Sequence, residues 1–198
     1  MDDEAELRAA CEARSFDQAT TLALERYGPE ILGLLAARLR SDGDAAEVFS
    51  IFAEDLWRGL PGFAWRCSLR AWAHRVARNA ANRYAVAGAR RAARNQPLGG
   101  ELVEAVADRV KSTTLVYLKS EVKSEIRRLR DELSPEDQLI LVLRVDKGLE
   151  WRDVAMALAD EDLDEAALVR EAARVRKRLQ LATARLRELA AERGLLAR

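Results

Sequence analysis

The stretch from residue 66 to residue 94 combines cations with groups that recognise nucleic acids. It has eight arginines and no acidic residue, interleaved with the rings of Trp72 and Tyr84 and the amides of Asn79 and Asn82. Arginines bind phosphates, amides pair with base edges, and aromatic rings stack on unpaired bases. This stretch predicts a surface for single-stranded or melting DNA. The alternative is that Trp72 belongs to the core and the arginines are solvated.

Helical spacing places these polar side chains on one face. A helix over residues 68–94 has Leu69, Ala73, Val76 and Ala80 as its apolar stripe, with the cations and amides opposite it or beside it. We expect His74, the one histidine of the chain, to be a polar surface residue. The candidates for DNA contact are Trp72, Arg75, Arg78, Asn79, Asn82 and Arg83.

A second cationic stretch lies near the C-terminus. Residues 170–187 hold seven basic side chains against one acid, Glu171, and lie behind a short helix that ends near Leu158. That order is a loose helix-turn-helix pattern, with the basic row opposite an apolar seam over 168–189. Heptad-like basic helices also form coiled coils. The candidates for contact with a DNA duplex are Arg170, Arg174, Arg176, Lys177, Arg178 and Arg185.

Acidic segments balance the basic ones. The formal net charge is zero, from 33 basic and 33 acidic residues, and residues 42–55 hold five acids and no base. An acidic surface with large apolar anchors favours a protein partner over DNA. An ordinary amphipathic helix is the alternative. The candidates for that protein contact are Glu47, Phe49, Ser50, Phe52 and Trp57.

The composition gives no support for catalysis. With one histidine and neither a CxxC nor an HExxH motif, we predict no catalytic residue, no metal, no cofactor and no small-molecule substrate. Cys11 and Cys67 stand far apart in the sequence, which fits a reducing cytoplasm. No apolar run approaches about 20 residues, and the N-terminal stretch is acidic and polar, so neither membrane insertion nor a secretory signal is expected.

High helix propensity throughout the chain predicts an all-α protein. Alanine, leucine, arginine and glutamate dominate, and the segment from Asn95 to Gly100 is the strongest linker signal. We predict two small helical domains, 1–94 and 113–198, joined by a flexible linker over 95–112. The second is expected to be a winged-helix-like, four-helix helix-turn-helix domain with an extended recognition helix.

Local signals set the expected helix boundaries in the first domain. A helix over 17–40 should bend or break at Gly28-Pro29. Asp42 or Asp44 should cap the next helix, and Ser68 the third.

The second domain has clearer signals. Ser134-Pro135 is a strong helix start, and the apolar run over 139–143 predicts a central helix that stops at Gly148. The last helix is expected from about residue 163 to 193.

Three motifs occur in an order typical of one bacterial family. Residues 72–79 (WAHRVARN) resemble its W-L-x-x-I-A-x-N signature. The start of its second DNA-binding domain is similar to residues 133–137 (LSPED) and 148–155 (GLEWRDVA). Its T-V-x-x-R-L-x-x-A recognition helix is similar to residues 174–179 (RVRKRL) with Ala182. The family is the extracytoplasmic-function (ECF) group of bacterial RNA polymerase sigma factors, in the sigma-70 superfamily, and the resemblance spans nearly the whole chain.

This resemblance implies a division of labour. The first domain would bind the β′ subunit of core RNA polymerase through residues 47–57 and capture the unpaired −10 promoter strand, with Asn79 near a flipped base and Arg75 and Arg78 on phosphates. The second would read the −35 element in the major groove. The linker would enter polymerase near the template path with its acids Glu101, Glu104 and Asp108.

The implied partners are therefore core RNA polymerase (β′ and β subunits) and promoter DNA, with an anti-sigma factor as a further candidate. Polymerase, and not this protein, would carry out the chemistry.

Three features depart from the family pattern. The usual A-E-D-x-x-Q is AAEVFS over 45–50, which lacks one acid and the glutamine, and Arg83 stands where an acid is common. Sixteen residues, Ala159 to Arg174, separate Leu158 from Val175, more than the family normally has. That insertion predicts a recognition helix lengthened by more than about two turns, with acid at its N-terminus.

Two other functions fit parts of the sequence. A helical DNA-binding regulator that never engages polymerase would bind duplex DNA by itself. A helical scaffold that dimerises through residues 168–189 would form a salt-insensitive dimer with no affinity for DNA.

Overall fold

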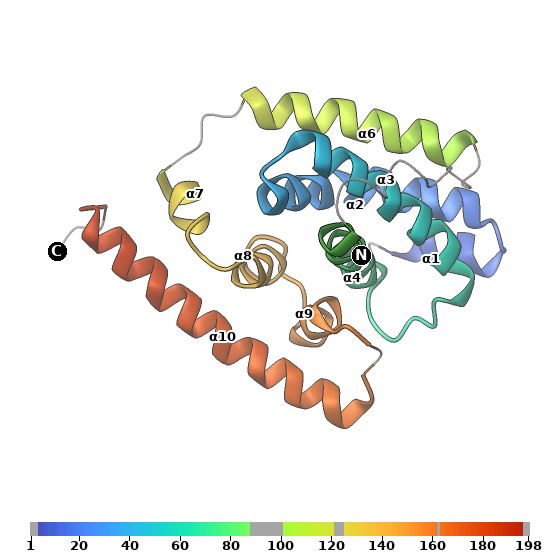
Figure 1. Ribbon diagram of the computed structural model, residues 1–198. Coiled ribbons are helices and arrows are strands. Elements are labelled where there is room, and N and C mark those ends of the chain that lie inside the picture. The colour runs from blue at the N-terminus through green and yellow to red at the C-terminus, as the bar shows by residue number, and fades with distance from the viewer. Residues whose placement is uncertain (1–3, 88–100, 121–124, 162, 196–198) are drawn as a thin grey trace. The chain divides into compact units, whose positions relative to one another are not determined.

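The computed structural model describes residues 4–87, 101–120, 125–161 and 163–195 (Figure 1). The chain divides into two compact units, Met1–Ser120 (unit 1) and Glu121–Arg198 (unit 2). Every regular element in the described residues is helical, which confirms the predicted all-α class.

Unit 1 is built on four long helices that share one core. Its elements are α1 (Ala5–Glu12), α2 (Phe16–Leu39), α3 (Asp42–Gly59), the short 3₁₀ helix η1 (Leu60–Gly62), α4 (Leu69–Ala87) and α6 (Glu101–Ser120). Helix α3 contacts α2, α4 and α6, and its apolar stripe is fully buried. This stripe consists of Ala45, Val48, Phe49, Phe52 and Leu56.

Helix α2 continues through Gly28-Pro29, where a bend or break was expected. Proline removes one backbone hydrogen bond. On both sides of it, however, Tyr27, Ile31 and Leu32 are buried in the core of unit 1. Packing of this face outweighs the lost bond, because most helical stability in proteins comes from tertiary contacts.

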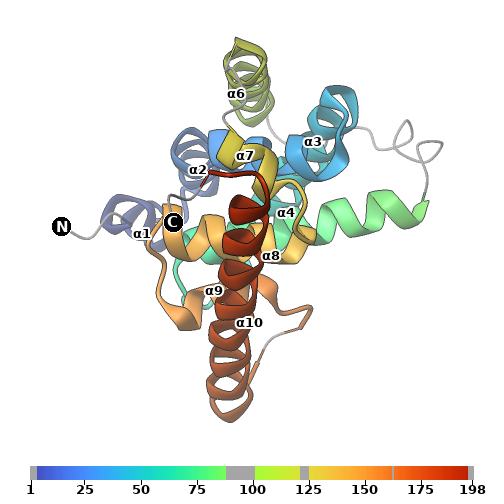
Figure 2. The ribbon, with the colours of Figure 1, turned by 90° about the vertical axis from the view of Figure 1, so that its left-hand side faces the viewer.

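Helix α6 occupies most of the segment predicted as linker. Residues 101–112 belong to α6, and Val103, Val106, Ala107 and Val110 are buried in the core of unit 1. In Figures 1 and 2, α6 lies over α2 and α3, in agreement with their contacts. The linker prediction is therefore wrong for 101–112, because apolar residues at helical spacing in this segment pack against α2 and α3. Residues 95–100 lie outside the described part of the chain.

Unit 2 consists of short helices along one long helix. The elements are α7 (Glu125–Arg130), α8 (Pro135–Leu141), the π-helical turn η2 (Val142–Asp146), α9 (Trp151–Leu158) and α10 (Glu165–Glu192). Figure 1 shows α7, α8 and α9 in succession along one side of α10, which contacts all three. The apolar run over 139–143 is mostly buried, and Gly148 follows η2 with a φ of +69°, a conformation that suits glycine.

Serine caps account for three helix starts. Ser68 and Ser134 accept hydrogen bonds from the backbone N–H groups of Ala71 (3.2 Å) and Asp137 (3.1 Å), as predicted. Helix α3 is capped by Ser41, at 3.2 Å from the Asp44 nitrogen, and not by Asp42 or Asp44. Asp42 and Asp44 instead occupy the first turn of α3, where their negative charges interact favourably with the positive end of the helix dipole.

Candidate nucleic-acid interface

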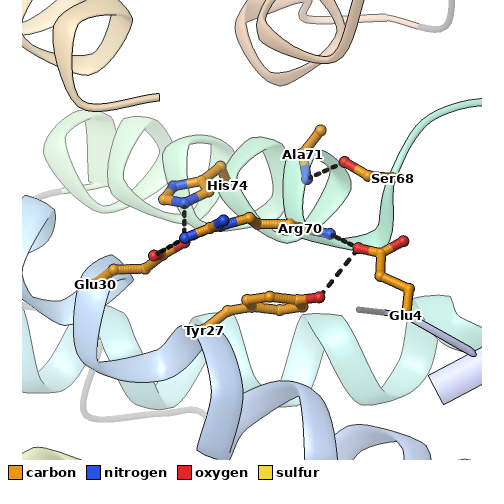
Figure 3. Close-up of polar contacts among 7 residues, drawn as sticks. All are labelled: Glu4, Tyr27, Glu30, Ser68, Arg70, Ala71 and His74. Carbon is orange, nitrogen blue, oxygen red and sulfur yellow. Dashed lines mark hydrogen bonds and ion pairs between the residues drawn. The ribbon is translucent and has the colours of Figure 1, made fainter. Parts of the chain in front are cut away.

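A buried ion cluster fixes the first turns of α4 (Figure 3). Arg70 donates from Nε and Nη2 to the two carboxylate oxygens of Glu30 on α2, at 2.8 and 2.6 Å, and Nε2 of His74 lies 2.9 Å from Glu30 Oε1. Burial raises the pKa of Glu30, but hydrogen bonds and charge from Arg70 and His74 lower it more, so the net pKa is well below its usual range. The Arg70–Glu30 contact thus holds the start of α4 against α2.

His74 is buried, and the prediction of a surface residue is wrong. Only 2% of it is exposed. It lies on the same face of α4 as Arg70, one turn further on, so both reach the Glu30 carboxylate. Burial of a polar ring is tolerated here because the carboxylate satisfies its nitrogen.

Glu4 closes the N-terminus of α4. Its carboxylate accepts from the backbone nitrogens of Leu69 (2.8 Å) and Arg70 (2.9 Å), and Tyr27 donates its hydroxyl to the same group at 3.1 Å. Helix N-termini have unsatisfied N–H donors that favour a carboxylate. The residue before α1 therefore orients α4 within unit 1 (Figure 3).

Trp72 is a core residue, as the alternative in the sequence analysis held. It is 9% exposed, and its ring stacks on Phe63 with centroids 4.8 Å apart. The half-buried ring nearby is Trp65, 4.9 Å from Phe63, with the Arg8 guanidinium 4.5 Å from its centroid. Trp65, rather than Trp72, is the partly exposed tryptophan beside Phe63.

A cationic cluster lies further along α4. Asn82 accepts a hydrogen bond of 2.5 Å from Nη2 of Arg38. Arg38 is the penultimate residue of α2, and α2 contacts α4. Loss of solvent lowers the pKa of Arg38, and the charge of Arg78 lowers it further. Two neighbouring guanidiniums make a site that favours an anion. Arg75, Arg78 and Asn79 are half-buried on this part of α4.

Arg38 was not predicted, and Arg83 has a partner inside unit 1. Arg38 lies in a different helix from the basic stretch, so no local pattern marks it. Arg83 forms an ion pair with Asp55 of α3. Tyr84 donates to Asp44 at 2.7 Å, which raises the pKa of the phenol. These contacts attach the second half of α4 to α3.

The candidates for a protein contact on α3 separate into buried and accessible residues. Phe49 and Phe52 pack in the core with ring centroids 5.4 Å apart, so they cannot contact a partner directly, which corrects the prediction. Glu47 is half-buried and Ser50 is exposed. Trp57 is half-buried and donates from Nε1 to Asp17 at 2.7 Å.

On α10, three of the predicted cations have acidic partners. Arg178 contacts Asp137 at 2.6 Å and Glu136 at 2.5 Å. Burial lowers its pKa, but hydrogen bonds and charge from these carboxylates raise it more. Arg174 and Arg185 form ion pairs with acids three residues away on α10, at 3.5 and 3.1 Å.

The other three predicted cations of α10 point to solvent. Arg170, Arg176 and Lys177 are exposed, and none of them has a carboxylate within ion-pair distance in the described residues. The guanidinium of Arg176 lies 5.2 Å from the Trp151 ring, which also carries Arg144 at 4.7 Å. Arg144 was not among the predicted contacts, because only tertiary packing brings it and Arg176 to the same ring.

The apolar seam of α10 is used within unit 2. Leu189 packs with Leu129 of α7, and Ala182 with Leu133 and Leu141. A scaffold that dimerises through this seam would need it exposed. The structure thus removes the surface on which that alternative depends.

The inserted segment begins as a loop and ends as helix. Asp164 caps α10, accepting from the Ala167 nitrogen at 2.7 Å, and Glu165 pairs with Arg152 of α9 at 2.5 Å. Leu168 and Ala172 of the first turns are buried. One of the inserted acids thus contacts unit 2 itself.

The described residues contain neither a metal-binding group nor a membrane-spanning helix. No group of three histidine, cysteine or acidic side chains is placed to hold a metal ion. None of the helices there is long and apolar enough to cross a membrane.

Comparison with known proteins matches the part of unit 1 built from α2, α3 and α4. Residues 23–91 match the family model of sigma-70 region 2. No curated protein and no solved structure matches the chain. The matched residues include the cationic cluster and the α3 surface described above.

Proposed function

Since residues 23–91 place this chain in the sigma-70 superfamily of sigma factors, we propose that it is an ECF-type sigma factor that binds core RNA polymerase and directs initiation at specific promoters. Region 2 of this superfamily serves polymerase binding and recognition of the −10 element. In this proposal polymerase carries out the chemistry, and the protein acts in the cytoplasm without a cofactor.

The cluster of Arg38, Arg78 and Asn82 supports a role for unit 1 at the −10 element. Arg38 and Arg78 would bind phosphates of the non-template strand. Asn79, one residue along α4, would hydrogen-bond a flipped base, and Trp65 would stack on a neighbouring one. Unstacking a base costs a few kcal/mol, so a surface held in place beforehand is needed to offset it. The ion cluster at the start of α4 supplies that rigidity.

Helices α9 and α10 support binding of unit 2 to the −35 element as a helix-turn-helix. The exposed Arg170, Arg176 and Lys177 would contact the duplex, in the major groove or on its phosphates. Arg178 would act as a positioning residue, because its carboxylate partners on α8 hold α10 in place.

On α3, the polymerase contact would involve the solvent-facing residues. Glu47 and Ser50 lie on that side of the helix, and Trp57 is accessible near its end. Phe49 and Phe52 would support this surface from the core. A β′ contact of this kind is acidic on the side of this protein.

The match to region 2 is the observation that carries the proposal, and transcription in vitro tests it. Core polymerase with the full chain should produce specific transcripts from genomic DNA, and core alone should not. On such a promoter, Arg38→Gln and Arg78→Gln should each lower open-complex formation about tenfold, the equivalent of about 1.4 kcal/mol. Arg26→Gln, an α2 variant outside the cluster, should leave opening unchanged.

A different result would contradict the proposal. Duplex binding by the chain alone, with no association with core polymerase in a pull-down, would instead favour the DNA-binding regulator. Equal loss of closed and open complexes in Asn79→Ala would contradict its role at a flipped base.

A further inference from the structure

Two cations from different elements of unit 2 contact one tryptophan ring. The guanidinium of Arg144, at the centre of η2, lies 4.7 Å from the centroid of Trp151. That of Arg176, on α10, lies 5.2 Å from the same centroid. A guanidinium is attracted to the face of an aromatic ring, so Trp151 holds both cations close to each other despite their like charge.

Neither cation is neutralised by an acid of the described residues. Arg144 and Arg176 have no carboxylate within ion-pair distance there, whereas the neighbouring Arg152 pairs with Glu165. Two adjacent positive charges without a counter-charge favour an anion. The region around Trp151 is therefore a candidate anion site.

Arg144 also has donors to spare. Of its five N–H groups, one on Nη1 donates to the carbonyl oxygen of Leu149 at 2.7 Å. Its Nε and Nη2 atoms have no hydrogen-bond partner in the described part of the chain, and neither is among the buried polar atoms that lack one. Both nitrogens are therefore accessible to solvent, and a ligand can reach them.

The backbone around Arg144 is fixed before any ligand binds. The π turn η2 is closed by a hydrogen bond of 2.9 Å from the N–H of Lys147 to the carbonyl of Val142, and π turns often occur at functional sites. Leu143 and Leu149 are buried, and the Leu149 N–H donates to the Leu143 carbonyl at 2.9 Å. A cation held in this way loses little conformational entropy when it binds an anion.

We propose that Arg144 and Arg176 bind backbone phosphates of duplex DNA at one site, with Trp151 as the positioning residue between them. This inference rests on the proposed DNA binding by unit 2, and it adds a contact residue that lies outside α10. Phosphate is the expected ligand because the planar guanidinium matches its oxygens with paired N–H donors. Such contacts orient the protein on DNA and carry no base specificity.

The site lies away from the acids at the start of α10. Asp164 is the N-cap of this helix and Glu165 is its first residue. Arg176 follows Glu165 by about three helical turns. Carboxylates repel phosphate, so a DNA strand bound at Arg176 avoids the repulsion that it would meet at the first turn of α10.

The salt dependence of DNA binding tests Arg144. The complex of the full chain with core polymerase is titrated with a promoter duplex and with an unrelated duplex over a range of salt concentrations. Arg144→Gln should lower the slope of log affinity against log salt by about 0.9 and weaken binding to both duplexes by the same factor. Arg144→Lys, which keeps the charge, should retain the slope. Arg152→Gln is the matched control and should also retain it, since Glu165 already neutralises that cation.

A second pair of variants tests the positioning role of Trp151. Trp151→Leu changes no charge, but one or both cations lose the ring that holds them, so the slope should fall by about 0.9 or more. Trp151→Phe keeps an aromatic face and should restore the slope. If the ring served only the stability of unit 2, both variants would lower the free energy of unfolding and leave the slope unchanged.

The outcomes separate this site from the proposed function. An unchanged slope in Arg144→Gln would overturn the site, and so would a loss of affinity confined to the promoter duplex. If Arg176→Gln still lowers the slope in that case, α10 binds DNA and only the role of Arg144 fails. If the unaltered chain with core polymerase binds no promoter, the proposed function fails, and the phosphate site fails with it.

Discussion

Helices α4 and α10 carry the two basic stretches of this chain, but their cations have different surroundings. On α4 the first arginine, Arg70, is locked to Glu30 inside unit 1, and Arg83 pairs with α3. On α10 the pairs are nearer the surface, and Arg170, Arg176 and Lys177 remain exposed. A basic stretch in a sequence thus contains both cations that hold a fold and cations that are available to DNA.

The aromatic residues of the two units differ in the same way. Trp72 of α4 is fixed between Phe63 and Gly59, whereas Trp151 of α9 is half-exposed between two guanidiniums. The ring of Trp72 stabilises unit 1. That of Trp151 packs against the guanidiniums of Arg144 and Arg176.

The largest effect is expected at Glu30. Glu30→Gln leaves the Arg70 charge without its anion and should lower the unfolding free energy of unit 1 by about 2–3 kcal/mol. This loss is smaller than for a fully buried pair because the Arg70 side chain is 23% exposed. Denaturant titration measures it. Glu188→Gln, which breaks an exposed pair on α10, should cost less than about 1 kcal/mol. Equal costs at the two sites would contradict the contrast between the helices.

Acid should weaken the same cluster. Because the folded pKa of Glu30 is below its unfolded value of 4.5, its contribution is complete above that pH and is lost as pH falls toward the folded pKa. The unfolding free energy of unit 1 should therefore decline as pH is lowered through 4.5. Glu30→Gln should lack this part of the decline. Parallel pH profiles for the two chains would remove Glu30 as its source.

Gly59→Ala tests whether Trp72 is fixed. A β-carbon there would lie 2.8 Å from Cζ2 of the Trp72 ring, so the ring or the end of α3 must move. We expect a loss of about 1–2 kcal/mol in unfolding free energy, since such overpacking exceeds the gain in helix propensity. Gly33→Ala, with open space around it, should be neutral or stabilising. A stabilised Gly59→Ala protein would indicate that Trp72 can move away, as a base-stacking ring would.

Substitution of Arg178 distinguishes a residue that positions α10 from one that contacts DNA. Arg178→Gln removes the ion pairs with α8 and should lower the stability of unit 2 by about 1 kcal/mol, measured by denaturant titration. The salt dependence of promoter binding should not change, because this arginine is neutralised inside the unit. A reduced salt slope would instead place Arg178 on a phosphate.

The smallest effect on stability is expected at Arg176. Arg176→Gln should change the unfolding free energy by less than about 0.5 kcal/mol. Promoter binding by the polymerase complex, measured over a range of salt concentrations, should show a slope lower by about 0.9. An unchanged slope would show that the exposed cation beside Trp151 does not contact DNA.

Local sequence patterns predicted much of the secondary structure. Ser68 and Ser134 cap the helices they were expected to cap, and the apolar stripes of α3 and α10 are buried. Capping and amphipathic spacing act within a few residues, so they can be recognised in one sequence. The region 2 resemblance is likewise carried by a contiguous segment.

The candidate site could be predicted only in part. Arg78 and Asn82 were marked by their spacing on α4, but Arg38 joins them from the end of α2. Phe49 and Phe52 were taken as partner contacts because a single helix does not show which apolar residues its neighbours will cover. Helix α6 provides one such neighbour.

The sequence by itself determined where α4 and α8 begin, which faces of α3 and α10 are apolar and where the cations lie along the chain. Only the tertiary structure decided which cation has a carboxylate beside it, as Glu30 has for Arg70 and Asp137 for Arg178. The reason is physical: helix formation depends on neighbours a few positions away, whereas ion pairing depends on distance in space between residues about 40 positions apart.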